Sequence, residues 1–69
     1  MIPNTRYGRG FLVGRIDGYR RGTMSLVHVA GAAALAKRCG VEEADITDLL
    51  HAFGLQWDAG HQAVIKKPS

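Results

Sequence analysis

Arginine is the residue whose number and spacing in this sequence point most directly to a chemistry. Residues 1–22 of the 69-residue chain contain five arginines and one acidic residue, Asp17, so this segment carries a net charge of +4. The arginines are Arg6, Arg9, Arg15, Arg20 and Arg21. The planar guanidinium group forms paired hydrogen bonds with phosphate oxygens and stacks on aromatic rings. The segment therefore predicts binding to a polyanion, and the competing interpretation is a solvated edge that only keeps the protein soluble.

Acidic residues gather in a second segment, and their chemistry is the opposite. Residues 32–54 contain four carboxylates and two cations, a net charge of −2. The carboxylates are Glu42, Glu43, Asp45 and Asp48, and the cations are Lys37 and Arg38. Carboxylates repel phosphates, yet they stabilise the first turn of a helix because they lie at the positive end of its dipole.

Nucleophilic and metal chemistry have little support in the sequence. Cys39 is the only cysteine, so the chain can form no internal disulfide, which suits a reducing compartment. His28, His51 and His61 lie in separate segments without the spacing of metal ligands. We expect Cys39 to be an inert thiol, and we expect no metal, no cofactor and no enzymatic activity.

The N-terminal third is predicted to be an arm followed by a strand. Residues 1–10 mix proline, asparagine, glycine and arginine without an apolar period, which indicates a flexible basic arm. Residues 11–16 are an apolar run that ends at Asp17-Gly18, a dipeptide typical of two-residue hairpin turns. We therefore expect a strand over 11–16, and whether 19–23 pairs with it or leads into the next element stays open.

Three short helices and a hairpin are predicted to follow. Thr23 or Ser25 caps the first helix and Gly31 ends it. An alanine-rich helix then runs to Gly40, and the acidic residues begin a third helix over 42–53, whose apolar positions recur every three or four residues. Residues 55–65 have the pattern of a β-hairpin, with Gly60 in the left-handed conformation.

The second and third of these helices have the spacing of a helix-turn-helix. This motif has a small residue, a glycine four positions later and an aliphatic residue six positions after the glycine. In this sequence these residues are Ala36, Gly40 and Ile46. With the local string GVEEADITDLLHAFG and the order of elements, residues 23–67 resemble the Cro repressors of lambdoid phages. The predicted fold is thus α+β and mostly helical: a helix-turn-helix domain over 11–67 with an N-terminal strand and a C-terminal hairpin.

This resemblance implies a small DNA-binding transcriptional regulator of the phage or mobile-element type. The residues that would contact phosphates are Arg15, Arg20, Arg21, Lys37 and Arg38, and those that would face the bases are Glu42, Glu43 and Thr47. A carboxylate has a direct role there only as an acceptor from a cytosine amino group. Two hypotheses therefore remain: the arginines anchor DNA while the acidic helix discriminates, or the acidic helix binds a protein, as in a phage-encoded modulator of a host complex.

The size of the chain bears on its partners. A single core in 69 residues supplies only about 3–5 kcal/mol, so we expect a homodimer that pairs through the hairpin or the N-terminal strand. Phe53 and Trp57 are expected to pack the hairpin against the helices, with exposure at a dimer interface as the alternative. No apolar run approaches the length of a membrane span, and we expect a cytoplasmic protein without membrane contact.

Overall fold

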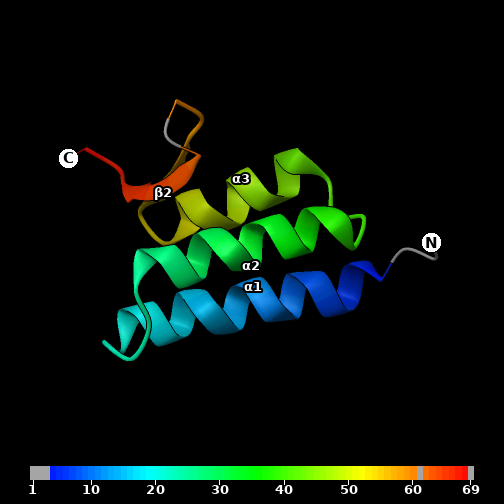
Figure 1. The fold of residues 1–69 in the computed structure, drawn as a ribbon, viewed down its shortest axis with the longest axis horizontal. Helices are drawn as coiled ribbons and strands as arrows, with labels where there is room; N and C mark the ends of the chain where they lie inside the picture. The colour runs from blue at the N-terminus through cyan, green and yellow to red at the C-terminus, as the bar shows by residue number, and fades with distance from the viewer. Residues whose placement is uncertain (1–3, 61, 69) are drawn as a thin grey trace.

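The computed structural model of the chain describes residues 4–60 and 62–68, and within them it is α+β. Its elements are α1 (Thr5–Arg20), α2 (Leu26–Arg38), α3 (Glu43–Ala52), β1 (Leu55–Asp58) and β2 (Ala63–Lys66). Figure 1 shows α1 and α2 side by side and running in opposite directions, with α3 and the hairpin on the other side of α2. The structure thus has three helices and a C-terminal hairpin, the predicted numbers, but two of the predicted helices form the single helix α2, and α1 was not predicted to be a helix.

The predicted N-terminal strand is wrong, because residues 11–16 lie in the middle of α1. Gly8, Leu12 and Ile16 recur every four residues and form the buried side of this helix, which is helical rather than strand periodicity. Asp17-Gly18 likewise continues the helix instead of turning, and the chain turns later, at Gly22, with φ +84°. The four glycines of the segment obscured this pattern, since glycine is a poor helix former and packing against α2 overrides its preference.

The predicted arm over 1–10 is replaced from residue 5 onward by the first turns of α1. The Asn4 side chain caps this helix by accepting a hydrogen bond from the Tyr7 backbone N–H at 3.2 Å. The Asn4 N–H also donates to the Cys39 carbonyl oxygen at 2.8 Å, which joins the start of α1 to the end of α2. Residues 1–3 of the predicted arm lie outside the described residues.

Helix α2 merges the two short helices that were predicted on either side of Gly31. It begins after Ser25, whose N–H donates to His28 Nδ1 at 3.2 Å. Its buried side continues through Gly31 without a break, from Val29 to Ala32, Ala33 and Ala36. Continuous burial and the strong helix preference of the alanines outweigh the cost of one glycine, about 1 kcal/mol.

The turn into α3 matches its prediction closely. Gly40 has φ +95°, in the region that favours glycine. Ala36 before it and Ile46 after it are both buried. In the hairpin, β1 pairs with β2 in antiparallel register, Leu55 opposite Lys66 and Trp57 opposite Val64. Among the described residues of its loop, Gln62 has a positive φ of +49°, whereas Gly60, which was expected to be left-handed, does not.

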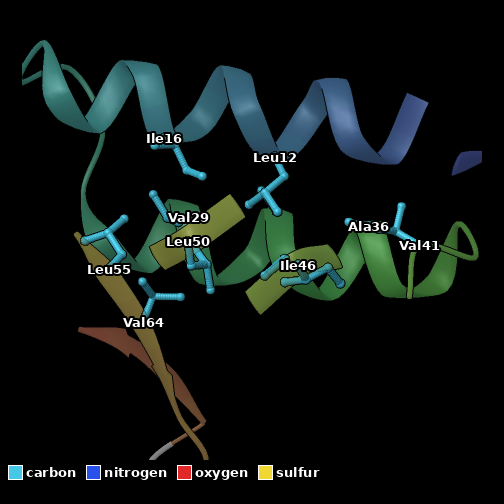
Figure 2. Close-up of a cluster of buried hydrophobic side chains, with 11 residues drawn as sticks. Leu12, Ile16, Val29, Ala36, Val41, Ile46, Leu50, Leu55 and Val64 are labelled. Carbon is cyan, nitrogen blue, oxygen red and sulfur yellow. The ribbon is translucent and has the colours of Figure 1, made fainter. Parts of the chain in front are cut away.

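Eleven buried side chains from every element form one core (Figure 2). Figure 2 shows Leu12 and Ile16 pointing from α1 toward α2, and Leu50, Leu55 and Val64 closing the opposite side. Alanine supplies three of the eleven, and the largest fully buried side chains are leucine, isoleucine and valine. Each such aliphatic group stabilises the fold by about 1.5–3 kcal/mol when buried.

Glycines on the two sides of α1 should respond oppositely to the same substitution. A Cβ at Gly8 would lie 3.0 Å from Ala36 Cα and 2.9 Å from Cys39 Cβ, whereas a Cβ at Gly14 would meet nothing within 4 Å. Gly14→Ala should therefore raise the free energy of unfolding by roughly 0.5–1 kcal/mol. Gly8→Ala should lower it by about 1–3 kcal/mol, because α1 and α2 must move apart. Urea denaturation of the two variants measures both values, and equal effects would contradict the close contact at Gly8.

Candidate functional site

One end of the molecule gathers cations from distant parts of the chain. The Arg20 guanidinium lies over the Phe53 ring, 5.3 Å from its centroid, at the end of α3. Gly54 follows Phe53 in the chain, and its carbonyl oxygen accepts a hydrogen bond from the Lys67 backbone N–H at 2.9 Å. Lys66 is opposite Leu55 in the sheet. Figure 1 shows the ends of α1, α3 and β2 at the same side of the molecule, with the start of α2 between α1 and the hairpin. We call Arg20, Arg21, Lys66 and Lys67 the basic end.

The charge of the basic end is almost uncompensated. Among residues 4–60 and 62–68, its one ion pair is with Asp17, whose Oδ2 lies 2.9 Å from Arg21 Nε. Both side chains are more than half exposed, so this ion pair is weak and solvent-screened. Four cations and one carboxylate give this end a net charge of +3, which equals the net charge of the whole chain.

The opposite end carries as many cations but is close to neutral. The hydrogen bond from Asn4 to Cys39 brings Arg6 and Arg9 of α1 to the side of Lys37 and Arg38 of α2. Helix α3 begins there as well, with Glu42 at its N-cap and Glu43, Asp45 and Asp48 within it. Lys37 Nζ lies 4.0 Å from Glu43 Oε2, and Arg9 lines one shallow cavity with Glu42 and Asp45.

The cations predicted to contact phosphates are thus divided. Arg20 and Arg21 belong to the basic end, whereas Lys37 and Arg38 lie at the neutral end. Arg15 belongs to neither, since its guanidinium lies 4.6 Å above the Phe11 ring and its Nη1 is 3.7 Å from Met24 Sδ. The sequence analysis did not place Lys66 and Lys67 in the site. The predicted hairpin could have indicated their position, because a hairpin after α3 returns the chain to the end of that helix.

The residues predicted to face DNA bases do not share one surface. Glu43 and Thr47 line a hollow between α2, α3 and the hairpin, and Glu42 faces the cavity beside Arg9. The exposed side of α3 instead carries Ala44, Asp45, Asp48, His51 and Ala52. The carboxylates on this side can accept hydrogen bonds, and the imidazole ring of His51 can donate one.

The hollow is a cavity of about 160 Å³. Ala33, Ala34 and Ile46 line its apolar part, and the Lys37–Glu43 pair lies on its rim. Trp57 also lines the hollow and is 38% exposed. The sequence analysis expected it to pack in the core, but its indole lies outside the core. Phe53 is half-buried against the core, in agreement with its expected packing role.

Other chemistry has no cluster of residues to support it. Among residues 4–60 and 62–68, no three His, Cys, Asp or Glu side chains are arranged to hold a metal ion. His28 is engaged with Ser25, whose Oγ lies 2.9 Å from His28 Nδ1, and Cys39 is half-buried at the end of α2. His61 lies outside the described residues. In the part of the chain that the structure describes, no helix is long and apolar enough to cross a membrane.

Comparison with protein-family models, with curated proteins and with solved structures finds no match to this chain. The function has to be argued from the arrangement of its own residues.

The position of Arg15 predicts a structural effect in place of a binding one. Its stem and guanidinium cover Phe11 and Met24, so Arg15→Ala should lower the free energy of unfolding by about 1 kcal/mol. Arg9→Ala removes the same charge from an exposed position of the same helix and should change stability by less than about 0.5 kcal/mol. Thermal or urea unfolding compares the two variants, and equal losses would contradict the packing role of Arg15.

Proposed function

We propose that this protein is a small duplex-DNA-binding protein that holds the phosphate backbone with its basic end. The observation that carries the proposal is the convergence of Arg20, Arg21, Lys66 and Lys67 from two ends of the chain. Phosphate contacts supply most of the affinity of proteins for DNA, and they require cations that are exposed and free of carboxylates. All four cationic residues of the basic end are exposed, and in the described part of the chain only Arg21 among them has a carboxylate partner, Asp17.

The positions of Ala36, Gly40 and Ile46 support a helix-turn-helix origin for this fold, and a small phage-type regulator remains the role we propose. The mode of contact must nevertheless differ from the usual one. A reading helix places its N-terminal residues against the bases, and the N-terminal turns of α3 carry Glu43 and Asp45. The basic end lies at the other end of α3, so DNA held there approaches the C-terminus of α3 and the base of the hairpin.

Two double variants with equal charge separate specific placement from overall charge. Arg20→Ala with Arg21→Ala removes two cations from the basic end, and Arg6→Ala with Arg9→Ala removes two from the neutral end. The first pair should weaken binding to a labelled random-sequence duplex at least about tenfold. It should also reduce the slope of log K against log salt by roughly 0.9 for each lost phosphate contact. The second pair should leave the slope unchanged.

Fluorescence anisotropy across a salt series measures these slopes. Lys66→Ala with Lys67→Ala should behave like the Arg20 and Arg21 pair, since the proposal places all four on one surface. Equal losses from both arginine pairs would overturn the basic end as the site. Absence of binding by the unmodified protein at low salt would overturn DNA binding itself.

A second candidate function rests on the exposed side of α3. Asp45 and Asp48 lie there without an ion pair in the part of the chain described, on a helix next to an apolar hollow. Such a surface suits a basic protein partner, and under this hypothesis the chain is a modulator of a host complex.

Neutralising the two aspartates tests whether α3 takes part in DNA recognition. Asp45→Asn with Asp48→Asn should strengthen DNA binding to every duplex by the same factor, about two- to fivefold, if α3 only adds repulsion to the bound complex. A change that depends on duplex sequence would instead give α3 a reading role. The measurement is anisotropy with random duplex and with duplex from the region around the coding sequence of the protein, at one salt concentration.

A further inference from the structure

The core of this protein is aliphatic, and several of its large apolar side chains are exposed. The described part of the core contains no fully buried aromatic residue, and three of its eleven members are alanine. Val27 is 78% exposed and Trp57, the only tryptophan of the chain, is 38% exposed. A domain of this size has little apolar surface to spare, so these exposed groups need an explanation.

Val27 and Trp57 belong to one surface along α2, whereas the other two exposed large apolar side chains, Tyr7 and Val13, lie on α1. Val27, Ala30, Gly31 and Ala34 are three or four residues apart, so they are neighbours on one side of the helix. Ala34 also lines the hollow beside Trp57, which joins the hairpin to this surface. No charged residue occurs between Ser25 and Ala36. We call Val27, Ala30, Gly31, Ala34 and Trp57 the neutral face.

We propose that the neutral face binds the neutral face of a second copy of this chain, across a two-fold axis near Gly31 and Ala34. In a two-fold interface the same surface meets itself, so a surface rich in one sign of charge repels its own copy. The outer side of α1 carries Arg6, Arg9 and Arg20, and the outer side of α3 carries Asp45 and Asp48. The neutral face is the helical surface that meets itself without such repulsion.

The shape of the neutral face also suits this partner. A Cβ at Gly31 would meet nothing within 4 Å, so the fold of one copy does not require glycine there. Because glycine has no side chain, a second helix can approach the backbone of α2 closely at Gly31. With Gly31 and Ala34 at the axis, Val27 and Trp57 cover the sides of the contact, and the hollow beside Trp57 receives apolar side chains of the other copy.

This surface differs from the dimer contacts expected from the sequence. The N-terminal strand that would have paired does not exist, because that segment is α1. The proposal does not rest on DNA binding, and its readout is the mass of the protein without DNA.

One matched pair of substitutions tests the proposal. Gly31→Glu and Gly14→Glu introduce the same side chain at exposed helical glycines with open space around them. Both should improve helix propensity, so neither is expected to unfold the protein. Gly31→Glu places two carboxylates at the two-fold axis and should weaken the dimer by at least roughly 100-fold, whereas Gly14→Glu on α1 should leave it intact.

Sedimentation equilibrium from micromolar to near-millimolar concentration gives the mass of each protein. Trp57 provides a second readout, since dimer formation covers the indole and shifts its fluorescence emission to shorter wavelength. We expect this shift in the unmodified protein and in Gly14→Glu, but not in Gly31→Glu. A monomeric unmodified protein at every concentration would overturn the proposal and leave the neutral face to a different partner. A dimer that Gly31→Glu and Gly14→Glu affect equally would also overturn it, and would indicate pairing through the hairpin.

Discussion

The contact between Gly8 of α1 and Ala36 of α2 is the constraint on which the rest of this structure depends. The helices approach so closely there that a methyl group at Gly8 would overlap the backbone of α2. Close approach requires small residues on the facing side of α2, and the buried Ala32 and Ala36 provide them. A core built in this way has little room for aromatic rings, and the aromatic residues consequently lie at its edge or on the surface.

The same contact determines how charge is distributed. Because α1 and α2 lie antiparallel, the start of α1 is beside the end of α2, and their arginines and lysine meet the carboxylates of α3. The end of α1 is left at the other side of the molecule, where the hairpin returns Lys66 and Lys67 to it. A chain whose arginines are spread over its N-terminal third thus becomes a molecule with one balanced end and one basic end.

The C-terminal part of the fold could be predicted from the sequence, and the N-terminal part could not. Gly40, Ile46 and the hairpin have local signals, namely a left-handed turn, helical periodicity and alternation, and each was read correctly. Helix α1 lacks such a signal, since its four glycines are typical of a loop. The reason for glycine at position 8 is its contact with α2, which belongs to the tertiary structure. The basic end has the same difficulty, because Arg20 and Lys67 are brought together only by the tertiary fold. Arg15 shows the converse, a cation with the right local pattern that packing withdraws from the surface.

The two proposed surfaces complement each other energetically. A basic end with a net charge of +3 neutralises few phosphates, and the affinity it supplies alone is weak and falls steeply with salt. A two-fold pair of such molecules presents two basic ends, and once one is bound to DNA the other acts at high effective concentration, provided that one duplex can reach both. Helix α2 begins beside the basic end, so a crossing near its middle places the two basic ends on opposite sides of the axis. Under the two proposals, pairing through the neutral face therefore strengthens DNA binding, because two weak electrostatic contacts act together in place of one.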